Sequence, residues 1–157
     1  MIKRGLAHPA GLLLFALAIT ACRARSSGSP ATPRAAASPA QLEEFAKLAL
    51  PEGARDVSVS AHTNPNVGRV FEARFVTTEE AARTFCAHNG LGGAITDVVG
   101  LNPKKREYFR VQGETSRRPF GCGSTSTQDR GIQREVFVTL PSGEAAVVHV
   151  VAFRLPS

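Results

Sequence analysis

The sequence predicts an α+β fold, in which an antiparallel sheet of about five strands carries two packed helices, after a signal peptide and a disordered tether. Three observations predict this fold. Apolar and polar residues alternate in several short segments, as in half-buried strands, whereas two other segments carry apolar residues at helical spacing. The elements follow in the order α-β-β-α-β-β-β, which suits an antiparallel sheet covered by helices. Eight of the nine phenylalanines lie beyond residue 38, enough for the core of one domain.

The first helix is expected directly after Ser38. Ser38 and Gln41 have the spacing of a capping box, and Pro39 takes the first helical position, where no backbone N–H is needed. Apolar residues then share one face, and Pro51 ends the run. These apolar residues are Leu42, Phe45, Ala46 and Ala49.

A β-hairpin and a second helix follow. Residues 57–62 and 71–75 alternate between apolar and polar side chains, and the sequence NPNVG at residues 64–68 has turn chemistry. The sequence TTEE at residues 77–80 opens the second helix with another capping box, and Gly90 ends it. One face of this helix comprises Ala82, Phe85, Cys86 and Asn89.

The C-terminal half has weaker signals. Residues 91–105 are ambiguous between loop, strand and helical turn, and residues 107–112 favour a strand. Residues 116–131 have the composition of a long, polar, Gly-rich loop. Residues 135–140 and 145–154 are predicted strands, and the last is so apolar that we expect a central strand covered on both faces.

The first 21 residues have the three parts of a secretory signal peptide. Lys3 and Arg4 form a positive start, an apolar run follows over residues 12–19, and the small pair Thr20 and Ala21 precedes the cut. The apolar run is shorter than the roughly 20 residues that a membrane-spanning helix needs. We therefore expect export rather than a permanent transmembrane helix.

The end of this segment resembles the lipobox of bacterial prolipoproteins. Ile19, Thr20, Ala21 and Cys22 match its pattern, with isoleucine where the commonest form has leucine. The resemblance implies cleavage before Cys22, a diacylglycerol on its thiol, and palmitate-type acyl chains that hold the protein at the extracytoplasmic face of the cell membrane. The alternative is an ordinary signal peptide cut nearby, with Cys22 incidental.

Residues 22–38 predict a flexible tether. Small residues, proline and arginine make up the segment after Cys22, so it cannot bury enough surface to fold. Its arginines either lie against anionic headgroups or are solvated. This composition resembles that of small lipoproteins of actinobacteria. Residues 39–157 are then expected to form a single α+β domain.

The chain has three cysteines. If Cys22 is lipidated, Cys86 and Cys122 remain as a pair in an oxidising compartment, which predicts a disulfide bond. The alternative is a nucleophilic Cys86 served by His88, although residues two apart on a helix point in different directions.

No motif for catalysis, a cofactor or a metal is evident. His62, His88 and His149 lie on separate predicted elements, without the local spacing that zinc ligands usually show. We expect His149 to be a core histidine and His62 to be solvated. The serines around Cys122 lie in no nucleophile elbow. Catalytic residues therefore stay unassigned, and no cofactor or metal is expected.

Basic residues concentrate between residues 104 and 118. They are Lys104, Lys105, Arg106, Arg110, Arg117 and Arg118. One hypothesis is a cationic face near Cys122 that meets phospholipid headgroups, an anionic envelope component or an acidic protein. The alternative is a set of scattered surface charges. Without Lys3 and Arg4, 17 of the 19 basic residues remain against 13 acidic ones, a charge of about +4 that indicates no particular partner. Nucleic acid is not expected for an exported protein.

These observations favour a membrane-anchored lipoprotein with a small non-catalytic binding or accessory domain on the outer face of the membrane. The alternative is a secreted-side hydrolase whose site is assembled only in the fold, and a third possibility is a purely structural lipoprotein. A pocket where histidine, cysteine and carboxylate groups converge with shifted pKa values would favour the hydrolase. A groove or basic patch without them would favour the binding domain.

Overall fold

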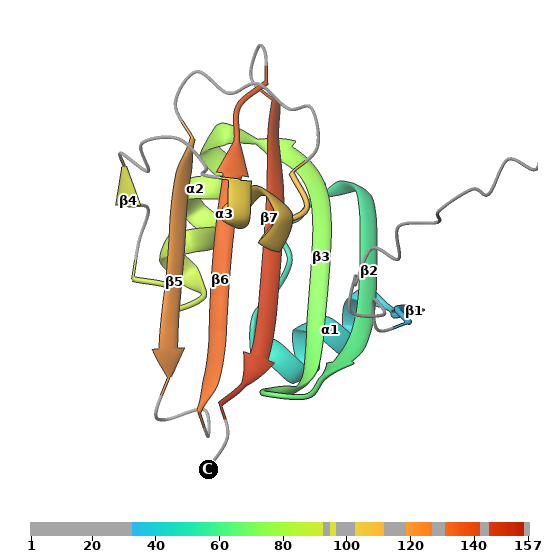
Figure 1. The fold of residues 1–157 in the computed structure, drawn as a ribbon. Helices are drawn as coiled ribbons and strands as arrows, with labels where there is room; N and C mark the ends of the chain where they lie inside the picture. The colour runs from blue at the N-terminus through green and yellow to red at the C-terminus, as the bar shows by residue number, and fades with distance from the viewer. Residues whose placement is uncertain are drawn as a thin grey trace, which may run out of the picture. The chain divides into compact units, whose positions relative to one another are not determined.

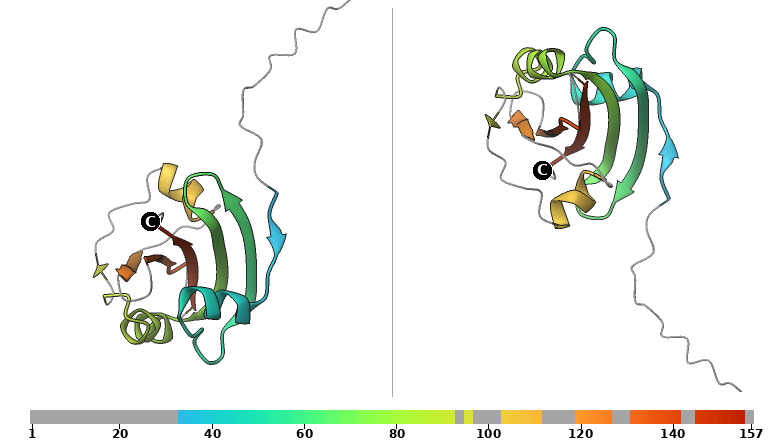
Figure 2. Two further views of the ribbon diagram at one scale, coloured as in Figure 1. Left: turned by 90° about the horizontal axis from the view of Figure 1, so that it is seen from below. Right: turned by 90° about the horizontal axis from the view of Figure 1, so that it is seen from above.

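The structure, a computed structural model, describes residues 33–92, 95–96, 103–111, 119–126, 131–141 and 145–155. The predicted signal peptide and Cys22 lie outside these residues. Within the described part, one antiparallel sheet has helices on both of its faces (Figure 1). Helices α1 and α2 cover one face and α3 lies on the other (Figure 2). We call these the core face and the α3 face.

The sheet is built around five long strands. They are β2 (Arg55–Asn64), β3 (Gly68–Thr78), β5 (Phe120–Ser126), β6 (Ile132–Thr139) and β7 (Ala145–Arg154). The two-residue strands β1 (Ala35–Ala36) and β4 (Ile95–Thr96) extend it to the order β1-β2-β3-β7-β6-β5-β4. The antiparallel α+β architecture is confirmed, but the predicted count of about five strands is too low. The described sheet has seven strands. Two of them, at the edges, are only two residues long, and such short strands leave little signal in the sequence.

Strand β7 lies at the centre of the sheet. It pairs with β3 on one side and β6 on the other, so that Val150 faces Ala73 and Val136. Residues 146–152 are buried without interruption. The sequence of β7 is therefore apolar for the predicted reason, which is that both faces of this strand are covered.

Helix α1 (Pro39–Ala46) has its predicted capping box. The backbone N–H of Gln41 donates to the Ser38 hydroxyl, and the Gln41 side chain accepts from the N–H of Ser38. The helix ends earlier than Pro51 because Lys47 adopts the left-handed conformation, with φ 51°. Ala49 therefore lies beyond the helix rather than on its apolar face.

Helix α2 (Glu79–His88) also begins and ends close to the predicted positions. The Thr78 hydroxyl caps it by accepting from the N–H of Ala81. A reciprocal capping box is not formed, because the third helical residue is alanine, which has no side-chain acceptor. The ring of Phe85 is buried edge-on against Phe75, with the ring centres 5.6 Å apart.

One hydrophobic core fills the space between these two helices and the core face. Its largest fully buried side chains include Leu42, Phe71, Phe75, Leu91, Phe120, Val138, Val148 and Val150. Alternate residues of each strand point to the opposite, α3 face, as strand geometry requires.

The strand predicted over residues 107–112 is wrong. Residues Pro103–Tyr108 form helix α3, which a turn ends. Phe109 then stacks on Phe137 of the sheet, with ring centres 5.5 Å apart, and Val111 is buried. The alternation of Phe109 and Val111, which suggests a strand, thus comes from the turn after α3, where Phe109 contacts the sheet and Val111 is buried.

The long loop predicted over residues 116–131 contains strand β5 instead. Its small residues suit this place, because a Cβ added at Gly123 would lie 2.7 Å from the carbonyl oxygen of Arg134 on β6. Gly123, which suggests a loop in the sequence, is thus required by the close pairing of β5 with β6. Among the described residues, no helix is long and apolar enough to span a membrane.

Candidate functional site

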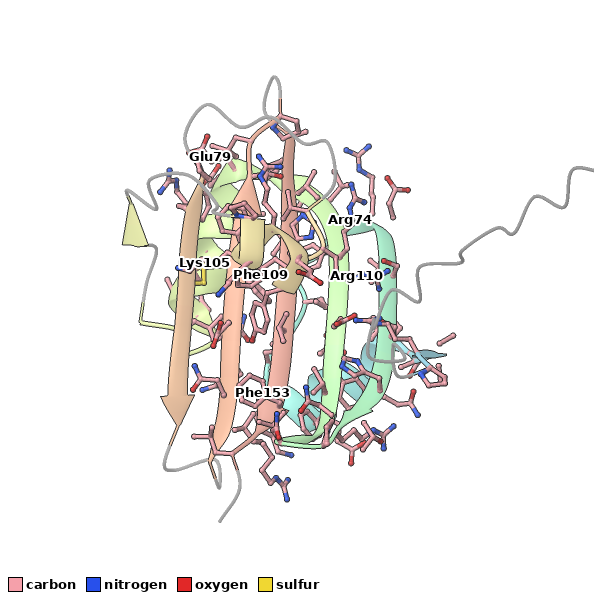
Figure 3. The ribbon with its side chains drawn as sticks, in the orientation of Figure 1. Arg74, Glu79, Lys105, Phe109, Arg110 and Phe153 are labelled. Atoms are coloured by element: carbon pink, nitrogen blue, oxygen red, sulfur yellow. A yellow bond between two sulfur atoms is a disulfide. The ribbon has the colours of Figure 1, made fainter. Side chains whose placement is uncertain are left out.

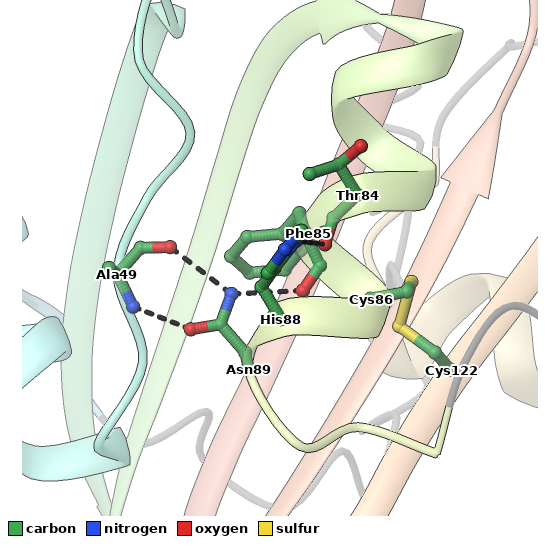
Figure 4. Close-up of a disulfide and its surroundings, with 7 residues drawn as sticks. All are labelled: Ala49, Thr84, Phe85, Cys86, His88, Asn89 and Cys122. Atoms are coloured by element: carbon green, nitrogen blue, oxygen red, sulfur yellow. Dashed lines mark hydrogen bonds between the residues drawn. A yellow bond between two sulfur atoms is a disulfide. The ribbon is translucent and has the colours of Figure 1, made fainter.

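The disulfide pair predicted from the sequence is present. Cys86 on α2 and Cys122 on β5 are bonded, with their Cα atoms 5.8 Å apart (Figure 4). The alternative, a nucleophilic Cys86 served by His88, does not fit this arrangement. Cys86 is fully buried, and the exposed His88 turns its Nδ1 atom to the carbonyl oxygen of Thr84 at 3.1 Å.

Asn89 ties the end of α2 to the segment after α1. Its side-chain amide donates to the carbonyl oxygens of Phe85 and Ala49, at 2.9 and 3.2 Å, and its side-chain oxygen accepts from the N–H of Ala49 at 2.7 Å (Figure 4). The disulfide and this amide fasten α2 on two sides. We therefore assign Cys86 and Cys122 a structural role.

The predicted cationic face is only partly described. Lys104, Lys105 and Arg106 are exposed on α3, and Arg110 follows in the turn. The predicted Arg117 and Arg118 lie outside the described residues. The described part of this face does not lie near Cys122, because α3 and Cys122 lie on opposite faces of the sheet (Figure 2). The side-chain alternation of β5 turns Cys122 toward the core.

A pocket of about 480 Å³ opens on the α3 face, between the end of α3 and strands β2, β3 and β7. It lies within the size range of small-molecule sites. Its polar lining comprises Ser58, Ser60, Glu72, Arg74, Tyr108, Arg110 and His149. Figure 3 shows Arg74 and Arg110 on this side of the sheet, one from β3 and one from the turn after α3.

Strand register brings most of these side chains together. Ser58 faces Arg74, which in turn faces His149, so one polar row crosses three strands. A second row begins with Ser60 opposite Glu72. The sequence marks these positions only as the polar side of amphipathic strands. The only sign of a site in the sequence is that β2 and β3, which a tight turn joins, both carry polar residues on the side that faces α3.

Glu72 is the centre of an ion-pair cluster. Its carboxylate accepts from Arg34 Nε at 2.8 Å and Nη2 at 3.2 Å, and from Arg110 Nη1 at 3.4 Å. His62 Nδ1 lies 3.9 Å from Glu72 Oε1. The hydrogen bond to Glu72 is the main cause of the raised pKa of Arg34; burial opposes it, and the negative charge of Glu72 adds a smaller increase. Arg34, within the predicted tether, thus belongs to the cluster, and His62 is largely buried rather than solvated.

Tyr108 closes the pocket beside this cluster. Burial, followed by the charge of Glu135 and a hydrogen bond to it, raises the pKa of the Tyr108 hydroxyl, and the charge of Glu72 adds to the effect. The hydroxyl therefore keeps its proton and donates to Glu135. Gln133 also donates to this carboxylate, at 3.2 Å.

Arg110 is held by an unusual backbone turn. The N–H groups of Phe109 and Val111 donate to the carbonyl oxygens of Lys105 and Arg106 at 2.9 Å, which closes the end of α3. Arg110 lies between them in the left-handed conformation, with φ 55°. Phe109 contacts Phe137 of the sheet and Val111 is buried, whereas the guanidinium of Arg110 is half-exposed, lines the pocket and reaches Glu72.

The arrangement can bind a polar molecule through charges and hydroxyl groups. His149 lines the pocket and is 3% exposed, as expected for a core histidine. In the part of the chain that the structure describes, no group of three or more His, Cys, Asp or Glu side chains is placed to hold a metal ion. Comparison of the chain with family models, with curated proteins and with solved structures finds no match.

Proposed function

We propose that the protein is an exported, lipid-anchored binding protein whose domain holds a small polar ligand in the pocket on its α3 face. The observation that carries this proposal is the pocket itself, which is concave and lined by two arginines, a carboxylate, two serines and a histidine. Such a combination of a formed cavity and a few converging polar groups is typical of ligand sites.

The membrane anchor is the second part of the proposal. Its support is the lipobox-like sequence that ends at Cys22, together with a disulfide of the kind found in oxidising compartments outside the cytoplasm. The chain between Cys22 and Arg34 reaches at most about 40 Å when fully extended. An anchored domain would thus stay near the cell envelope and take its ligand there.

Binding fits the site better than hydrolysis does. A histidine that acts as a general base is typically oriented by a hydrogen bond to a carboxylate. His62 Nδ1 lies 3.9 Å from Glu72, and Arg34 already occupies that carboxylate. Tyr108 holds its proton firmly and is a poor general base at neutral pH. These contacts position groups for recognition rather than for proton transfer.

Native mass spectrometry of the protein extracted with mild detergent from the membranes of its own host tests the proposal. We expect a chain that begins at Cys22 with added acyl groups and carries a small molecule released on unfolding. Ser60→Tyr places a ring in the pocket and should abolish the bound molecule, whereas Thr63→Tyr, at an exposed position of the same strand, should retain it. A chain without acyl groups, or a molecule that survives Ser60→Tyr, would contradict the proposal.

A further inference from the structure

We propose that the ligand carries an oxyanion, a carboxylate or a phosphate group, and that Arg110 binds it after leaving Glu72. This inference rests on the proposed function, because it names the chemical class of the ligand that the pocket takes. It follows from the contacts of Arg34 and Arg110 with Glu72, from the exposure of Arg110 and from the serine hydroxyl groups that line the same pocket.

Glu72 keeps a partner when Arg110 leaves. Arg34 donates to this carboxylate twice, at 2.8 and 3.2 Å, in the forked geometry that suits arginine and carboxylate. Arg110 donates once, at 3.4 Å, which is a longer and weaker contact. A ligand oxyanion can therefore take Arg110 without leaving the largely buried Glu72 unpaired.

Arg110 is also the more exposed of the two arginines that contact Glu72, since the side chain of Arg34 is 37% exposed. The side chain of Arg110 is 51% exposed, compared with 13% for Glu72. Solvent around the half-exposed Arg110 screens its single, long contact with Glu72, so this contact is readily exchanged for one with another anion. The guanidinium plane presents several N–H donors at once and matches the oxygens of a carboxylate or phosphate.

The rest of the lining complements an oxyanion. Arg74 adds a second positive charge, and the hydroxyls of Ser58 and Ser60 add neutral hydrogen-bond donors on the neighbouring strand. The hydroxyl of Tyr108 is engaged by Glu135 and limits that side of the pocket. The charges that line the pocket thus sum to a positive value, with two arginines against the single carboxylate of Glu72.

The backbone at Arg110 supplies a sharp test. Left-handed residues at helix ends are usually glycine, which adopts this conformation without strain. Arg110→Gly should therefore remove the guanidinium while it preserves or improves folding. Lys47 gives a matched control, because it is also a basic residue in the left-handed conformation at a helix end, with φ 51°, but follows α1 on the core face.

The experiment titrates the mature, disulfide-bonded protein with inorganic phosphate and with acetate, and follows the fluorescence of Tyr108. The chain has one tyrosine and no tryptophan, so the signal comes from the pocket. We expect saturable binding that Arg110→Gly weakens by about tenfold to a hundredfold, as for a lost charge-assisted contact. The midpoint of thermal unfolding should stay equal or rise. Lys47→Gly should leave the affinity unchanged.

Competition identifies the source of the oxyanion. Vesicles that contain phosphatidylglycerol should displace bound phosphate if the ligand is a lipid headgroup, and a free anion is indicated if they do not. Equal affinity in Arg110→Gly and the unmodified protein would overturn this inference. If neither anion binds but the molecule retained in native mass spectrometry is lost in Ser60→Tyr, the binding function stands and the oxyanion assignment fails. If that molecule is absent as well, both fail.

Discussion

Among the described residues, Tyr108 has a hydroxyl group whose pKa is raised by its surroundings. Burial, the charge of Glu135, a hydrogen bond to Glu135 and the charge of Glu72 all raise the pKa of this hydroxyl above the ordinary value of about 10. The protonated form is thus favoured in the folded state. By linkage, the stability that Tyr108 contributes is complete below about pH 10 and decreases as the pH rises further, because the unfolded chain then loses a proton that the folded chain retains.

An alkaline titration checks this directly. Since the chain has a single tyrosine, the ultraviolet absorbance of tyrosinate reports on Tyr108 alone. We expect it to develop at clearly higher pH in the folded protein than in the protein unfolded by urea. Tyr108→Phe should flatten the decrease in stability above about pH 10. Coincident titration curves for the folded and unfolded chains would show that the hydroxyl has no such environment.

At the scale of elements, Arg134 on β6 joins the ends of both core helices. It is 4% exposed, and its Nη1 atom donates to the carbonyl oxygens of Ala46, Lys47 and Asn89 at 3.2–3.4 Å. These carbonyls belong to the last turns of α1 and α2, where free acceptors and the helix dipole both favour a cation. The buried guanidinium of Arg134 thus interacts with the C-terminal ends of both helices, as basic side chains on the surface commonly do.

Removal of this side chain should loosen both helices. We expect Arg134→Met to lower the free energy of unfolding by about 2–4 kcal/mol, because the apolar replacement keeps the volume but leaves buried carbonyl oxygens without their donor. Urea denaturation followed by circular dichroism measures the change. Arg154→Met, at an exposed position near the end of β7, should change the stability by less than about 0.5 kcal/mol. Equal effects of the two substitutions would contradict the role of Arg134.

Elements with local signals are the ones that the sequence predicts. The cap at Ser38, the turn at residues 64–68 and the apolar run of β7 each act within a few residues, so the first helix, the hairpin and the central strand are all recognisable. Strand β5 is different, because the glycine at its centre is explained only by β6, whose backbone leaves no room for a Cβ at Gly123. Helix α3 is not predicted, because the apolar and polar residues at its end and in the following turn alternate as they do in a strand.

The candidate site is less predictable than the fold. Arg110 is noted in the sequence only as a member of a basic run, and Glu72 only as a polar position of a strand. Their contact depends on the register of β2 with β3 and on the crossing of residues 103–111 over the sheet, neither of which is local. Arg34 is the clearest case, since a segment with the composition of a tether supplies the strongest partner of Glu72.

At the scale of the whole molecule, the disulfide connects the two halves of the domain. It joins α2, which follows the hairpin, to β5, which follows β4 and α3 in the chain, across 36 residues of sequence. Closure of a loop of this length restricts the unfolded chain by roughly 4 kcal/mol in the entropic description.

We expect the Cys86→Ala, Cys122→Ala double variant to lose about 2–4 kcal/mol of folding free energy. Urea denaturation measures the loss, and reduction of the unmodified protein should reproduce it. Because the bond lies on the core face, the affinity of the pocket should change little in the variant as long as it remains folded. A large loss of affinity with little loss of stability would instead place the cysteines in the function of the pocket.

The place where the chain enters the domain has a mechanical consequence. Strand β1 forms two residue pairs with β2, and Arg34 just before it is bound to Glu72. A pulling force on the chain before Pro33 would reach these contacts first and would peel them open in succession, rather than shear the long strands. Glu72 would then lose the two hydrogen bonds from Arg34 and would compete with the ligand for Arg110. Under tension, the domain would release an anionic ligand before any of its core unfolds.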